Sequence, residues 1–138
     1  MDYETNVNCF LGVFEHYKTD EVKVFTIGKL RNDIEELLEF FKENKELNQW
    51  HISFNGLAFD AQITEYILRN AKMLKALEGE IAAEKIYAKA QDCIDRSSRR
   101  DFQEWSEKNL SIKQIDIFKL NHWDNPAKRS SLKWIQCG

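Results

Sequence analysis

The hydrophobic pattern changes its period near Gly28, and this change constrains the fold more than any other feature of the sequence. Residues 9–14 form a continuous apolar run, and alternation continues over 22–27, with the polar stretch 16–21 between them. Beyond Gly28 the apolar residues recur at intervals of three and four. Period two indicates strands and period 3.6 indicates helices, so the pattern predicts an antiparallel hairpin followed by helices that cover it.

The later segments extend this into a mixed α/β domain. Ile34, Leu37, Leu38 and Phe41 mark one face of a first helix. The other predicted elements are a strand over 50–54, a helix from Asp60 with Phe59, Ile63, Tyr66 and Ile67 on one face, helices over 72–95 and 99–108, a strand over 112–118, a loop over 121–129 and a helix from 131. Strands and helices mixed without a linker favour one α/β domain.

Composition excludes several classes of protein. With 138 residues, 43% of them apolar, the chain has enough material for one ordinary core and does not resemble a disordered segment. A net charge of −3 gives no global basic footprint. No apolar run approaches the roughly 20 residues of a membrane helix. The odd set Cys9, Cys93 and Cys137 fits a reducing compartment, so we expect a cytoplasmic protein.

Two acidic elements are candidates for chemistry. Asp2 and Glu4 are two positions apart, and on a strand both side chains would leave the same face. Such a pair suits Mg²⁺ or Mn²⁺, although chance alone gives roughly four acid-x-acid pairs in a chain this acidic, and a solvated strand edge is the alternative. In the second element Asn55-Gly56 ends a strand and Asp60 opens a helix. Asp60 there is either a metal ligand or a helix cap.

The order of three motifs resembles the DEDD (DnaQ-like) 3′–5′ exonuclease family. The motifs are Asp2-x-Glu4-Thr5, then Asn55-x-x-x-Phe59-Asp60, then Ile115-Asp116-Ile117 with the segment 128–133. The closest style is that of proofreading exonucleases in phage and mobile-element DNA polymerases. The resemblance implies a ribonuclease H-like fold, a mixed sheet flanked by helices. Residues 71–110 would then be a helical insertion before the last strand.

Residue by residue, the resemblance implies a site and a substrate. Asp2, Glu4 and Asp60 would be catalytic ligands of a two-metal centre that holds Mg²⁺ or Mn²⁺. Thr5, Asn6, Asn55 and Phe59 would contact the terminal nucleotide of a single-stranded DNA 3′ end, with a core role for Phe59 and a turn role for Asn6 as alternatives. Asp116 falls where the family has an aspartate that is usually not a ligand, so we assign it a structural role.

The chain departs from the family pattern at both ends. The third motif, with its Tyr or His base and fourth acidic ligand, has no match before Gly138, and only Met1 precedes Asp2. We therefore expect residues 1–138 to be a single exonuclease-like domain shortened at both ends, with weak or absent nuclease activity. The three histidines, His16, His51 and His122, do not replace the missing base.

Other functions stay open from the residues alone. One is an inactive nuclease-like module that binds nucleic acid or a polymerase partner through bases and aromatics near the end of the chain, namely Lys119, His122, Trp123, Lys128, Arg129, Lys133 and Trp134. Another is a helical protein-interaction domain built on 72–108. A third is a ribonuclease H-like enzyme of another branch.

Overall fold

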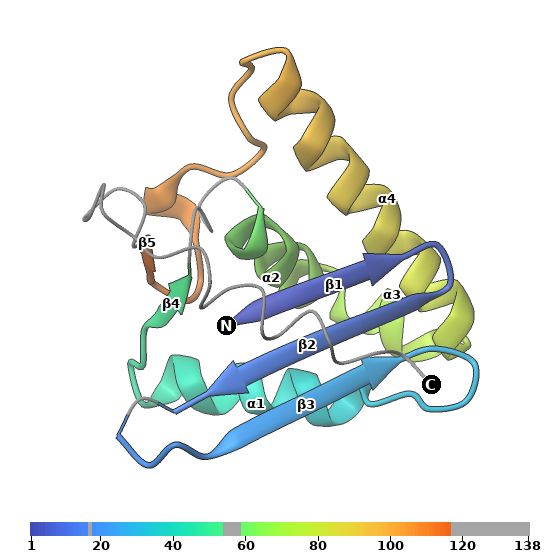
Figure 1. Ribbon diagram of the computed structural model, residues 1–138, viewed down its shortest axis with the longest axis vertical. Coiled ribbons are helices and arrows are strands. Elements are labelled where there is room, and N and C mark those ends of the chain that lie inside the picture. The colour runs from blue at the N-terminus through green and yellow to red at the C-terminus, as the bar shows by residue number, and fades with distance from the viewer. Residues whose placement is uncertain (17, 54–58, 117–138) are drawn as a thin grey trace.

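The computed structural model describes residues 1–16, 18–53 and 59–116, which form a mixed α/β unit (Figure 1). This confirms the predicted α/β class. The elements are β1 (Asp2–Asn6), β2 (Cys9–Glu15), β3 (Val22–Ile27), α1 (Ile34–Glu46), β4 (His51–Ser53), α2 (Asp60–Arg69), α3 (Ala71–Ala76), α4 (Gly79–Ser98), the 3₁₀ turn η2 (Glu107–Asn109) and β5 (Gln114–Asp116).

Strands β1, β2 and β3 form one antiparallel sheet in that order, which confirms the predicted hairpin between β2 and β3. Strands β4 and β5 form a separate parallel pair, with Ile52 opposite Ile115. A hydrogen bond of 3.2 Å from the Met1 amine to the Ile52 carbonyl connects the two sheets. The start of β1 therefore lies beside β4.

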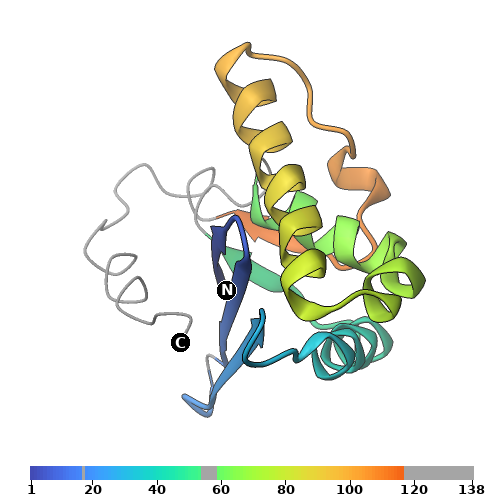
Figure 2. The same ribbon diagram turned by 90° about the vertical axis from the view of Figure 1, so that its right-hand side faces the viewer.

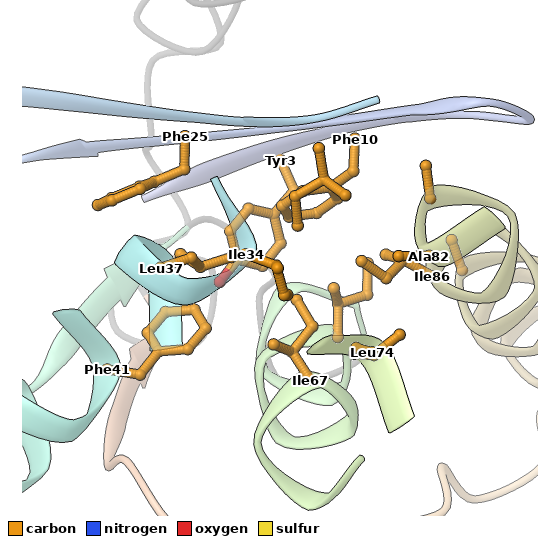
Figure 3. Packing of buried hydrophobic residues seen from close by; sticks show 14 of the residues in the cluster. Tyr3, Phe10, Phe25, Ile34, Leu37, Phe41, Ile67, Leu74, Ala82 and Ile86 are labelled. Atoms are coloured by element: carbon orange, nitrogen blue, oxygen red, sulfur yellow. The ribbon is translucent and has the colours of Figure 1, made fainter. Parts of the chain in front are cut away.

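The helices cover one face of the three-stranded sheet, as the edge-on view shows (Figure 2). Between the layers lies one apolar cluster, in which the β-strand side chains Tyr3, Phe10 and Phe25 meet Leu37 of α1 and Ile86 of α4 (Figure 3). Helix α4 begins so close to the sheet that a Cβ on Gly79 would stand 2.2 Å from the Gly28 carbonyl oxygen. Only glycine fits at that contact.

The first two predicted helices are confirmed. In α1 the residues spaced by three and four, Ile34, Leu37 and Phe41, are buried, and Leu38 packs against the same cluster. Helix α2 begins at Asp60, and Ile63 is fully buried in the core. Apolar periodicity located both helices because their buried faces are continuous stripes.

The single helix predicted over 72–95 is wrong, because two helices occupy it. Leu77 and Glu78 are extended, with ψ angles of 154° and 150°, and they separate α3 from α4. The break allows α3 to pack its Leu74 into the core while α4 turns to cross the sheet. Leu77 and Glu78 both favour helices, but Gly79, whose helix propensity is low, directly follows them.

The helix predicted over 99–108 is also wrong apart from the short turn η2. Arg100 adopts a left-handed conformation, with φ of 59°. The Arg100 N–H then donates to the Ser97 carbonyl and the Asp101 N–H donates to the Arg96 carbonyl, which is the pattern of a Schellman helix end. The chain leaves α4 there and runs back toward β5 in an irregular path.

The strand predicted over 112–118 is confirmed as β5 only over Gln114–Asp116. Its residues 117 and 118, the predicted loop over 121–129 and the helix from 131 lie outside the described residues, as do the basic and aromatic residues of the proposed nucleic-acid patch. The segment 71–110, expected as an insertion, supplies α4, whose Ala82, Ala83, Ile86 and Ala90 belong to the main core.

Candidate functional site

Strand β1 places its two acidic side chains on one face, as the i and i+2 spacing predicts. Tyr3, between them, points into the core, where its ring lies 5.1 Å from Phe10 and 5.8 Å from Phe14. Side chains alternate along a strand, so Asp2 and Glu4 leave the opposite face, and both are partly buried there. Their partners on β2, Val13 and Leu11, are buried at 3% and 1% exposure.

A chain of hydrogen bonds connects β1 to the first turn of α2. The Thr64 hydroxyl donates to the Asp60 carbonyl over 3.0 Å, and it also forms a hydrogen bond with the Tyr3 hydroxyl. Because Thr64 has one hydroxyl hydrogen, Tyr3 donates in that second bond. Burial raises the pKa of Tyr3 well above its ordinary value, so the phenol keeps its proton. The bonds fix the start of α2 against β1.

Asp60 is buried in the first turn of α2, at 7% exposure. Phe59 occupies the N-cap position, and its side chain makes no capping hydrogen bond. The structure therefore places Asp60 one position inside the N-cap of α2. A carboxylate in the first turn is nevertheless favoured by the positive end of the helix dipole.

The Met1 amine lies within electrostatic range of two predicted ligands. Burial lowers the pKa of this amine, whereas the negative charges of Asp60, Asp2 and Glu15 raise it. The amine also donates to Ile52 of β4. The folding of β1, β4 and α2 therefore brings residues that are far apart in the sequence to one end of the sheet.

The predicted ligands do not gather around one point. Within residues 1–16, 18–53 and 59–116, no group of three or more His, Cys, Asp or Glu side chains is placed to hold a metal ion. The physical reason is strand alternation, because Asp2 and Glu4 project from the face opposite Tyr3, and α2 packs on the Tyr3 face.

The residues predicted to contact the nucleotide lie in separate places, some at the end of β1 and one directly before α2. Thr5 and Asn6 lie at the hairpin end of β1, where Asn6 pairs with Cys9, and Asn6 is exposed. Phe59 is partly buried and packs against the core cluster, in agreement with the core role. Asn55 lies outside the described residues. Asp116 ends β5 opposite Ser53.

The histidines in the described residues do not supply a base at this site. His16 lies in the turn after β2, where its Nδ1 accepts a hydrogen bond from the Lys18 N–H. His51 is buried in β4, and burial lowers its pKa to about 4. His122 lies outside the described residues.

Sequence reasoning missed a buried polar network between α2 and the segment that follows α4. Glu65 of α2, at 1% exposure, accepts hydrogen bonds from the N–H and the hydroxyl of Ser111. Gln62 exchanges two hydrogen bonds with the backbone of Trp105. Lys89, also buried, pairs with Glu104 at 2.7 Å. No local spacing reveals such pairs, because the partners are 15 to 46 residues apart.

Comparisons with protein families, with curated proteins and with solved structures found no match for this chain. In the described part of the chain, no helix is both long enough and apolar enough to cross a membrane.

Proposed function

We propose that the chain is a metal-dependent nuclease domain with a ribonuclease H-like fold, which hydrolyses phosphodiester bonds at the 3′ end of DNA. The strand arrangement supports the fold. Strands β1 to β3 are antiparallel, β4 and β5 are parallel, and the bond from Met1 to Ile52 lies on the free side of β1. If the two sheets are taken as joined at the bond from Met1 to Ile52, their strands follow the order β3-β2-β1-β4-β5.

The observation that carries the proposal is the link from Tyr3 through Thr64 to Asp60. It holds the buried carboxyl-bearing turn of α2 against the strand that presents Asp2 and Glu4. If β1 were only a structural strand edge, the first turn of the adjoining helix would not need a buried acid. Asp60 is 7% exposed there.

In this function Asp2, Glu4 and Asp60 would hold the divalent cations. When bound, the cations would activate water and stabilise the leaving 3′ oxygen. The packing of Tyr3 on Phe10 and its hydrogen bond with Thr64 would serve this function by holding β1 against the first turn of α2, the two elements that carry these carboxylates. A two-metal site requires its ligands to converge, so the separation of the described acids predicts weak activity.

A second candidate is a nuclease-like module that binds nucleic acid or a polymerase partner without cleaving DNA. The absence of a three-ligand group among the described residues favours it. Such a module would keep the fold and the Tyr3 link but would have little affinity for Mn²⁺.

The two candidates differ in their response to Mn²⁺. We would titrate the chain with Mn²⁺ by electron paramagnetic resonance and follow Mn²⁺-dependent shortening of a 5′-labelled single-stranded oligonucleotide. The variants are Asp2→Asn and Asp60→Asn, with Glu84→Gln as the matched control, because Glu84 is exposed on α4 away from β1. Urea unfolding would show that each variant is folded.

For a nuclease, Asp2→Asn and Asp60→Asn each weaken Mn²⁺ binding and abolish shortening, whereas Glu84→Gln changes neither. For a binding module, the oligonucleotide binds equally with and without Mn²⁺ and is not shortened. If the chain binds neither Mn²⁺ nor the oligonucleotide, the nuclease is refuted and a polymerase partner is the remaining form of the second candidate.

A further inference from the structure

Strand β3 is the outer strand of the three-stranded sheet (Figure 1), and no other described strand pairs with its outer edge. At its far end, the Thr26 N–H donates to the Asp33 carboxylate and the Thr26 carbonyl accepts from the Asp33 N–H. Thr26 therefore directs its backbone groups away from β2. By alternation in this unbulged strand, Val24 and Val22 direct theirs outward as well.

The groups at Val22 and Val24 form an open edge. In the part of the chain that the structure describes, no backbone or side-chain group bonds to them. Their side chains are 52% and 41% exposed. Natural sheets usually protect such an edge, because unpaired N–H and C=O groups accept a further strand.

A groove of about 450 Å³ lies beside this edge, between β3 and α1. Four glutamates of α1 line it, namely Glu35, Glu36, Glu39 and Glu43. Within the described residues none of the four is in an ion pair. Glutamates four positions apart on a helix repel one another, so Glu35, Glu39 and Glu43 make this wall of the groove favourable for further positive charge.

The groove also has aromatic walls that accept a cation. Phe25 and Phe40 line it, and the Lys23 ammonium stands 5.3 Å from the centre of the Phe40 ring. Ammonium and guanidinium groups are attracted to such ring faces. Lys23 is thus one ammonium group of the chain that lies over an aromatic wall of the groove.

We propose that the β3 edge and this groove together bind an extended basic peptide as an added strand. The backbone of the peptide would pair with Val22 and Val24. Alternate side chains would enter the groove, where the glutamates and Phe40 select Lys or Arg. The intervening side chains would lie on the other face beside the exposed valines, which favours Val, Ile or Thr. Main-chain pairing gives affinity and alternate pockets give specificity in this binding mode.

Charge decides between this partner and the alternatives. A second copy of the chain would offer its own β3, in which Lys23 is the single basic residue. A nucleic acid would be repelled by four carboxylates. The proposal does not depend on the nuclease function, because β3 and α1 contribute none of the candidate metal ligands.

The test uses three synthetic peptides and the whole chain, measured by isothermal titration calorimetry at 150 mM NaCl. The first peptide alternates lysine with valine and threonine over seven residues. The second has glutamate at every lysine position. The third keeps all lysines but has proline at the central threonine, which preserves the charge and prevents strand pairing. Light scattering without peptide reports self-association.

Two variants test the site from the protein side. The double variant Glu35→Gln/Glu39→Gln neutralises two carboxylates of the groove wall. It should weaken binding of the first peptide about five- to tenfold, because two ion pairs are lost. Glu84→Gln, exposed on α4, is the matched control and should not change binding. Val22→Pro removes an outward N–H at the first position of the strand and should weaken binding by a similar factor.

The expected result is that the first peptide binds at least tenfold more tightly than the second and the third. Equal binding of the first and third peptides would overturn strand addition, and no binding of the first would overturn the proposal entirely. Dimerisation of the chain without peptide, abolished by Val22→Pro, would assign the edge to a second copy instead. If Val22→Pro does not fold, a lysine peptide N-methylated at alternate residues supplies the same test.

Discussion

His51 is a buried histidine between β4 and α1, and lowering the pH should destabilise the fold through it. Its ring lies 5.8 Å from Phe41 and 5.5 Å from Phe14, and its Nε2 forms a hydrogen bond of 3.0 Å with the Asn44 amide. Burial, together with the positive Met1 amine, lowers its pKa to about 4. Among the residues that the structure describes, the Nδ1 atom has no hydrogen-bond partner that could stabilise a second proton.

The direction and the size of this change in stability follow from proton linkage. An unfolded histidine binds its proton near pH 6.5, whereas folded His51 stays neutral until about pH 4. The unfolded state therefore gains protons first, and stability falls as the pH drops through this window. The difference between the unfolded and folded pKa values of His51 corresponds to about 3.4 kcal/mol of unfolding free energy in full. About 2 kcal/mol of this is lost by pH 5.

The assay is urea unfolding, followed by tryptophan fluorescence, at pH 7.5 and pH 5.0. Carboxylates also titrate in this range, so the quantity compared is the difference between the wild type and His51→Gln. We expect that difference to shrink by about 2 kcal/mol at pH 5.0, because the variant lacks the proton acceptor. His16→Gln, in an exposed turn, is the matched control and should keep the wild-type dependence. A wild-type minus His51→Gln difference that is constant with pH would refute the reasoning.

Three further predictions concern packing and burial. Phe41→Ala should lower the free energy of unfolding by about 3–5 kcal/mol, since Phe41 is fully buried, and a urea midpoint close to wild type would contradict this. Tyr3→Phe should cost about 1–2 kcal/mol by removing the hydrogen bond to Thr64, and equal stability would show that this bond is not needed. Burial raises the pKa of Cys93 to about 11. Alkylation of Cys93 by iodoacetamide at pH 8, measured by peptide mass mapping, should therefore be at least tenfold slower in the folded chain than after unfolding in urea. Equal rates would contradict the burial of Cys93.

The fold could be predicted where one face of an element is continuously buried. The stripe through Ile34, Leu37 and Phe41 located α1, and the run over 9–14 located β2. The prediction failed at the end of α4, because the left-handed Arg100 has no glycine to signal it. It also failed at Leu77 and Glu78, which are extended although both residue types favour helices, and the low helix propensity of Gly79 directly after them was not recognised as a break.

The candidate site divides in a similar way. The spacing of Asp2 and Glu4 was sufficient to put both on one face of β1, because alternation is a local property of a strand. The burial of Asp60 and its link through Thr64 to Tyr3 could not be read from spacing, since the partners are 61 positions apart. Whether three acids converge is likewise a property of how a helix packs on a sheet.

By itself, then, the sequence determined the α/β class, the hairpin and the faces of the first two helices, because local periodicity follows directly from backbone geometry. Only the tertiary structure decided that Glu65 and Lys89 are buried with partners, and that the outer edge of β3, as far as the described residues go, is unpaired beside an acidic groove. The physical reason is that desolvation and pairing depend on neighbours brought together from distant parts of the chain.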